Sequence, residues 1–345
     1  MLTHQLVRKF LWMAPLFLST LACNTISQLI GSQFPDTTNL PAQSSSSSPA
    51  ASDAACSALL PDILHAATSN GDAGGSSAFL DDEQDVRYLV VYNLEGDDLG
   101  SRDDLLVPGD LENNLDSRAS HEYIWNYFAS LIPPEERAFV TEFSVLSDGP
   151  NHILAGVSPT YDNPNEWTLK VDVVDAGDPY SLTYSLLHEF GHFLTLNSSQ
   201  VPPDSQVFFN PEDTALREQA VASCPRYYTG EGCSNSGSYM DDFYNRFWSS
   251  FSEDWTEASK TGGEEIQTER LDDFYNQYKD QFLTRYAAIS PEEDIAESWT
   301  YFILLPKPES TSITDQKILF FYNYPELVAL REETLNRMCE AFPKQ

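Results

Sequence analysis

The chain has 345 residues, of which 53 are acidic and 19 are basic, so its formal net charge is −34. This balance argues strongly against nucleic-acid binding, because phosphate contacts require lysine and arginine. It favours high solubility and is compatible with a saline or cation-rich habitat. The acidic stretches 81–85 and 95–98 lack the spacing of a known calcium loop, so we expect solvated surface there rather than calcium sites.

The N-terminus has the pattern of an export signal. Arg8 and Lys9 precede the apolar run 10–18, which is too short for a comfortable membrane span. Ala22 directly before Cys23 is similar to a bacterial lipobox, although Thr20 stands where an aliphatic residue is usual. We predict a signal peptide over 1–22, lipidation of Cys23 and attachment to the cell envelope outside the cytoplasm, with simple secretion as the alternative.

The chain after the signal divides into a tether and a folded part. Residues 23–55 are rich in serine and proline and show no periodic apolar pattern, which is typical of a flexible tether. Residues 56–345 are enough for one large domain. We expect that domain to have two lobes, a sheet lobe with the motif helix over 56–197 and a helical lobe over 198–345.

The first lobe is predicted to contain a small mixed sheet. A helix around 120–128 is ended by Pro133 and Pro134. Four segments read as strands from their β-branched and aromatic content: 86–92, 139–146, 153–157 and 167–174.

The most informative segment is His188-Glu189-Phe190-Gly191-His192, inside the apolar helical stretch 179–194. Residues four apart lie on the same face of a helix, so both imidazoles can reach one ion. Glu189 lies beside the metal but off the ligand line, where it can take a proton from a water held by the metal. This is the chemistry of a zinc peptidase. The alternative, an amphipathic helix whose histidines are only hydrogen-bonded, is costly on a buried face.

The third ligand separates subgroups of such peptidases. The metzincin continuation needs a glycine and a further histidine where this chain has Thr195 and Ser198, so that subgroup is excluded. The remaining possibility is a carboxylate from a later helix.

Segment 291–302 fits that role, with Ser290 as N-cap and Pro291 in the first turn. Glu293 and Glu297 then share a face. Glu293 can bind the metal, while Glu297 accepts the free ring N–H of a ligand histidine. Glu292 and Asp294 remain rival ligands. The predicted helices of this lobe are 239–251, 269–286, 291–305 and 325–342, and 198–238 and 253–263 are expected to be loops.

The His-Glu-Phe-Gly-His motif and the later Tyr-x6-Glu-x-x-Ala-Glu together resemble the gluzincin-type zincin peptidases, the group that includes the anthrax lethal factor catalytic domain and related bacterial zinc-binding lipoproteins. The resemblance covers two short segments, not the whole chain. It implies an α+β zincin-like fold with Zn²⁺ held by His188, His192 and Glu293. It also implies that Tyr286, seven residues before Glu293, stabilises the oxyanion.

The remaining histidines fit a metal site poorly. His4 lies in the leader, and His65, His121 and His152 have no partner at ligand spacing in the sequence, so each is expected to be an ordinary surface or core residue.

If Cys23 carries lipid, an even number of cysteines remains, which favours two disulfides in an exported chain. Cys224 and Cys233 bracket a short loop, and by elimination Cys56 would pair with Cys339. A cysteine zinc site is the alternative, but the spacing matches no common pattern.

These features together predict a monomeric zinc metalloendopeptidase that acts on peptides or proteins and contacts a membrane only through its lipid anchor. Two alternatives stay open. One is a catalytically inert surface lipoprotein that uses a zincin scaffold for binding or adhesion. The other is an interaction domain with a structural zinc, which would need a fourth protein ligand.

Overall fold

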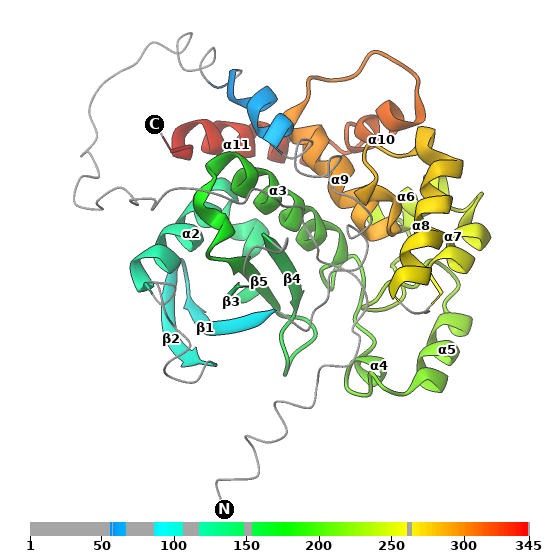
Figure 1. Cartoon of the computed structure of the whole chain (residues 1–345), viewed down its shortest axis with the longest axis horizontal. Coiled ribbons are helices and arrows are strands. Elements are labelled where there is room, and N and C mark those ends of the chain that lie inside the picture. Colours follow the sequence, from blue (N-terminus) through cyan, green and yellow to red (C-terminus); the bar gives the residue numbers. More distant parts are fainter. Residues whose placement is uncertain are drawn as a thin grey trace, which may run out of the picture.

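The computed structural model describes residues 56, 58–66, 86–105, 117–147, 154–260 and 264–343. The predicted signal peptide, Cys23, the tether, His4, His152 and the acidic stretch 81–85 lie outside these residues. The described part combines a five-stranded sheet with helices (Figure 1), so the predicted α+β class is confirmed.

The sheet is mixed, with strand order β2-β1-β3-β5-β4. β3 and β5 pair in parallel, whereas the other neighbours are antiparallel. β4 stands at one end of this strand order, so it is an edge strand among the described residues. The strands are β1 Arg87–Glu95, β2 Asp98–Asp104, β3 Val140–Ser147, β4 Ala155–Pro159 and β5 Trp167–Asp172.

Four of these strands coincide with predicted ones, and β2 is the one that the sequence did not predict. β2 is the other edge strand, and most of its side chains are exposed or half-buried, including Asp103 and Asp104. It therefore lacks the apolar alternation that signals a strand. Gly96, at φ 66°, makes the tight turn from β1.

Two helices cover one face of the sheet, α2 Arg118–Leu131 and α3 Pro179–Leu196. In α2, Trp125 contacts Phe143 of β3, with ring centroids 5.7 Å apart. Phe193 of α3 contacts both Trp167 of β5 and Phe128 of α2. The motif helix is thus fixed against the sheet by aromatic packing.

The second half of the chain is helical, with corrections to the predicted pattern. Its helices are α4 Ser205–Phe208, α5 Thr214–Ser223, α6 Tyr239–Phe247, α7 Ser252–Ala258, α8 Glu264–Tyr278, α9 Pro291–Leu304, α10 Ile313–Phe321 and α11 Pro325–Ala341. The expected loops 198–238 and 253–263 were wrong where α4, α5 and α7 form. α5 buries no residue, so no apolar stripe marks it. α10 was not predicted.

The predicted helix 269–286 was also wrong in its second half. α8 ends at Tyr278, and two short 3₁₀ turns follow, Lys279–Gln281 and Tyr286–Ala288. The aromatic spacing that suggested one long helix has another cause. Phe282 is buried because it packs on Trp248 and Phe274, not because the helix continues.

Two pairs of cysteines lie at disulfide-bonding distance. Cys56 pairs with Cys339, and Cys224 with Cys233, at Cα–Cα separations of 5.3 and 5.6 Å. Both pairs match the prediction, and the first ties the start of the described chain to α11. Figure 1 shows this first segment beside α11. Two disulfides indicate an oxidising environment outside the cytoplasm. Among the described residues, no helix is both long and apolar enough to cross a membrane.

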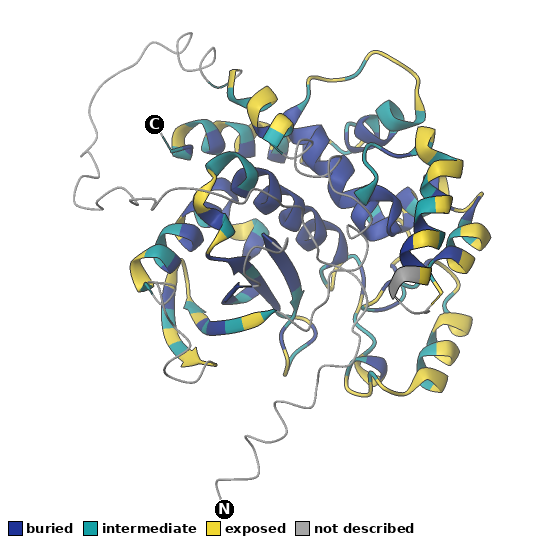
Figure 2. Ribbon diagram, in the orientation of Figure 1, coloured by how far each residue is buried: buried dark blue, intermediate teal, exposed yellow. Residues whose placement is uncertain are grey.

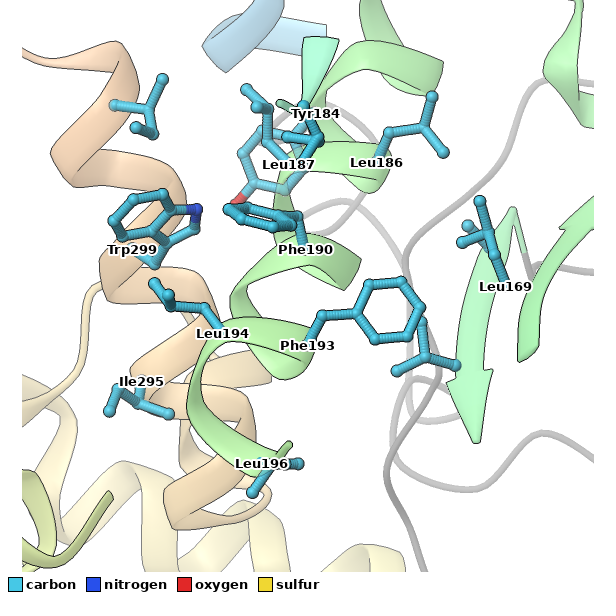
Figure 3. Packing of buried hydrophobic residues seen from close by; sticks show 14 of the residues in the cluster. Leu169, Tyr184, Leu186, Leu187, Phe190, Phe193, Leu194, Leu196, Ile295 and Trp299 are labelled. Atoms are coloured by element: carbon cyan, nitrogen blue, oxygen red, sulfur yellow. The ribbon is translucent and has the colours of Figure 1, made fainter. Parts of the chain in front are cut away.

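The motif helix is sandwiched in the middle of the molecule. Figure 3 shows Phe193 and Leu186 of α3 on the side of β5, and Leu187, Phe190 and Leu194 on the side of α9. Every residue of α3 from Leu182 to Leu196 is buried, and so is every residue of α9 (Figure 2). Polar side chains on these two helices are therefore held in the interior.

Candidate metal centre

The motif residues lie in the second half of α3, whose N-terminus is well capped. Asp178 accepts hydrogen bonds from the backbone N–H groups of Tyr180 and Ser181, and Pro179 occupies the first turn. The helical spacing brings the rings of His188 and His192 to 4.9 Å between centroids. Both histidines are buried.

The opposing carboxylates come from α9, which starts as the sequence indicated. Ser290 caps the helix by accepting the N–H of Glu293 at 3.2 Å. α9 approaches α3 closely at Gly191, where an added Cβ would lie 2.9 Å from the Cα of Ala296. The glycine between the two motif histidines therefore lets the second helix come near enough for Glu293 to reach them.

Three side chains converge on a small volume. The Nε2 atoms of His188 and His192 lie 3.0 and 3.3 Å from the same oxygen of Glu293, Oε2. Two ligand atoms at ~2.0–2.1 Å from a tetrahedral zinc ion are about 3.3 Å apart, so this spacing suits a common ion. Within the described residues, His188, His192 and Glu293 are the one group of three acidic, histidine or cysteine residues that could hold a metal.

The electrostatics of the group show that it is short of positive charge. Burial alone would lower the pKa of His188, but its contacts with Glu293 and Glu297 outweigh burial and raise that pKa to about 10. Burial would raise the pKa of Glu293, but the two histidines hold it at about 2. The carboxylates thus favour a protonated imidazole at His188. A metal cation that binds here would replace that proton.

The rival acids face other partners. Glu292 accepts hydrogen bonds from the hydroxyl of Tyr227 at 2.9 and 3.1 Å. Burial and the neighbouring Glu231 raise the pKa of Glu292 to about 7. Asp294 pairs with the buried Lys317 and accepts the indole N–H of Trp248 at 2.7 Å. Neither belongs to the converging group, so Glu293 is the acid that can serve as the third metal ligand.

Glu297 lies where the sequence placed it, behind the first histidine. Its Oε1 is 3.2 Å from Nδ1 of His188, outside strict hydrogen-bond geometry. Two hydroxyls hold the carboxylate: Tyr184 donates to both oxygens at 2.9 Å, and Thr284 donates to Oε2 at 2.9 Å. A carboxylate fixed in this way can orient the imidazole ring that it faces.

Sequence reasoning missed these two hydroxyls. Tyr184 stands four residues before His188 and so shares its helix face, a spacing that could have identified it. Thr284 follows α8 in an irregular segment and reaches Glu297 only through tertiary structure, so no sequence signal marks it.

Glu189 differs from every other acid near the group. Its side chain is 0 % exposed, and neither carboxylate oxygen has a hydrogen-bond partner. Burial raises its pKa, because the charged form is poorly solvated. Both ring nitrogens of His192 also lack hydrogen bonds. Buried polar atoms are normally paired, so these orphaned atoms fit a site that holds an ion and a polar ligand.

Tyr286 begins the 3₁₀ turn Tyr286–Ala288 rather than ending a long helix. Its ring lies 5.6 Å from that of His188, at an interplanar angle of 61°. The tyrosine named by the resemblance is therefore beside the first motif histidine. His121, in contrast, is buried in α2 against the hydroxyl of Tyr92, 2.9 Å from Nδ1, and takes no part in the group.

Comparisons with known proteins add no assignment: no protein-family model, curated protein or solved structure matches this chain.

Proposed function

We propose that this chain is a zinc-dependent endopeptidase with a zincin-like architecture. The observation that carries the proposal is Glu189, a fully buried carboxylate without a hydrogen-bond partner next to three converging ligand atoms. A structural zinc site does not need such a group and requires a fourth protein ligand, whereas the described part of the chain brings three together.

The residues have complementary roles in this proposal. His188, His192 and Glu293 would hold Zn²⁺, which would supply a Lewis acid for the peptide carbonyl and the attacking water. Glu189 accepts the proton of the attacking water and delivers it to the leaving amine. Tyr286 donates a hydrogen bond to the oxyanion. Glu297, held by Tyr184 and Thr284, keeps the ring of His188 in its ligand orientation.

Edge strand β4 supports a peptide as the substrate. Among the described residues it pairs only with β5, and α3 packs near it. Its other side can pair with the backbone of an extended peptide, which gives affinity without reading sequence. The two disulfides suit an exported enzyme, and we propose the lipid anchor at Cys23 from the sequence alone.

The test combines Glu189→Gln with a matched control, Glu253→Gln, which changes an exposed glutamate of α7. Elemental analysis gives the metal content, and a diverse peptide library measures turnover. We expect both variants to retain zinc, and Glu189→Gln to lose at least about 10²-fold in kcat, since proton transfer by a positioned base contributes at least that much. Cleavage by Glu189→Gln at the wild-type rate would falsify the assignment. Zinc binding without cleavage by the wild type would leave the inert-scaffold alternative.

A further inference from the structure

A cavity lies beside the first turn of α9, the turn that also carries Glu293. It encloses about 170 Å³, space for one long side chain. Its inner wall is formed by buried Tyr227, Leu271, Ile289 and Glu292, and Glu231 and Trp255 line it further out.

The cavity adjoins the metal group through the chain itself. Glu292 immediately precedes Glu293, and Ser290, which also lines the cavity, caps the N–H of Glu293. The N–H of Ile289 bonds to the carbonyl of Tyr286, whose ring faces His188. The charge of Glu231 is near enough to act on His192. A peptide held at the metal therefore has this cavity within reach of a neighbouring side chain.

The walls are preformed rather than loose. The loop that carries Tyr227 and Glu231 is closed by the Cys224–Cys233 pair and by the bond from the N–H of Thr229 to the carbonyl of Gly232. Gly232 packs so tightly that an added Cβ would clash with the carbonyl oxygen of Pro202. The indole N–H of Trp255 donates to the carbonyl of Ile289 at 2.8 Å, which fixes the opposite wall.

The chemistry of the lining selects one class of side chain. Apolar and aromatic walls suit a methylene stem. Two glutamates, Glu231 and Glu292, lie in the lining, and Arg217 from α5 is its single cationic side chain. Acidic side chains therefore outnumber cationic ones there. A cationic head group can pair with Glu231, which lies in the outer part of the cavity.

We propose that this cavity is a recognition pocket for a lysine or arginine side chain of the peptide substrate. The inference rests on the proposed peptidase function for the identity of the ligand as a peptide. It adds that cleavage occurs near a basic residue and names Glu231 as a residue that determines specificity.

Binding is measured first, without turnover. Tryptophan fluorescence of the zinc-loaded Glu189→Gln chain follows titration with hexapeptide amides of alanine that carry one lysine or one norleucine at each position in turn. We expect lysine to bind about tenfold more tightly than norleucine at one position, the effect of a hydrogen bond to a charged group. Equal binding of the lysine and norleucine peptides at every position would overturn the proposed recognition pocket.

Variants then test which residues cause the lysine preference. Glu231→Gln is expected to remove the lysine preference, and Glu253→Gln to keep it. Val221 lines the opening and is 49 % exposed, so Val221→Lys adds a cation there without disturbing the interior. It should weaken the lysine peptide several-fold but not the norleucine peptide, with Val221→Gln as the control for size. A lysine preference unchanged in both Glu231→Gln and Val221→Lys places recognition elsewhere.

Turnover of the zinc-loaded chain separates the two proposals. Cleavage that depends on Glu189 but shows no preference for a basic residue contradicts the pocket and leaves the peptidase. A lysine preference in binding, without cleavage of any peptide, contradicts the peptidase and leaves the pocket.

Discussion

Two buried polar clusters lie one residue apart on α9, and they are built differently. Asp294 faces Lys317, and both are 0 % exposed, so this cluster contains its own counter-charge. Glu293 faces two histidines, with Glu189 and Glu297 beside it, and the ion pairs of Glu293 and Glu297 are formed with histidines. Among the described residues, the first cluster is balanced in charge by the chain, although one oxygen of Asp294 lacks a hydrogen bond. The second cluster has excess negative charge, and both oxygens of Glu189 lack hydrogen bonds.

The charge balance indicates a structural role for the first cluster, whereas the second could bind a cation. A buried ion pair with its partners in place holds two elements together, and Lys317 also lies 4.5 Å from the ring centroid of Phe282. A buried cluster that the chain leaves incomplete costs free energy unless an external cation completes it. The neighbouring ion pair holds the first turn of α9 in position, and the metal group makes use of that position.

Removing the counter-charge of the balanced cluster should give the largest effect. Lys317→Met leaves Asp294 buried and uncompensated, and we expect a loss of about 3–5 kcal/mol in the free energy of unfolding. Denaturant titration measures this. Adding Asp294→Asn should recover most of the loss, whereas Lys307→Met, at an exposed lysine, should change stability little. A double variant as unstable as the single one contradicts the assigned pairing.

Supplying the missing charge of the other cluster should stabilise the chain. Zinc at 100 times its dissociation constant adds about 2.7 kcal/mol to the free energy of unfolding, because it binds only the folded state. Thermal unfolding with and without zinc shows the effect as a rise in Tm. Glu293→Gln should abolish the rise, and His121→Gln, at a buried histidine outside the group, should keep it. A rise that persists in Glu293→Gln means that the metal binds elsewhere.

Moving α3 and α9 apart tests whether their close packing is needed for the three metal-binding side chains to converge. Gly191→Ala places a Cβ against Ala296 and should cost about 1–3 kcal/mol in stability, the usual effect of overpacking. It should also weaken zinc binding, since Glu293 moves away with α9. Gly177→Ala is the matched control, because an added Cβ there meets nothing within 4 Å. Unchanged zinc affinity in Gly191→Ala would show that the approach is not required.

The smallest expected effect concerns the support of Glu297. Tyr184→Phe removes the hydroxyl that bonds both carboxylate oxygens, and we expect about tenfold weaker zinc binding, at the low end of the effect of such supporting partners. Competition with a metal-sensitive dye measures the affinity. Tyr180→Phe, on the same helix, should bind zinc as the wild type does. Identical affinities for both variants would remove Tyr184 from the site.

Prediction from the sequence succeeded where a single local pattern, such as residue spacing on a helix, marks the structural element. Residue spacing placed His188 and His192 on one helix face, and the Ser290-Pro291 pair set the start of α9 at Pro291, its observed first residue. Four strands with β-branched cores were identified, and β2, α4, α5, α7 and α10 were not. β2 lies at an edge, and α4, α5 and α7 are largely on the surface, where burial does not impose a strong apolar period. α10 was missed although it buries Ile318, Phe320 and Phe321.

By itself the sequence determined the motif helix, the two cysteine pairs and the list of acids from which a third ligand could come. Only the tertiary structure decided among Glu292, Glu293 and Asp294, which are consecutive and chemically alike. Their side chains point from α9 about 100° apart, so one meets the histidines, one meets Tyr227 and one meets Lys317. That choice depends on which helices pack around α9, and no local pattern encodes it.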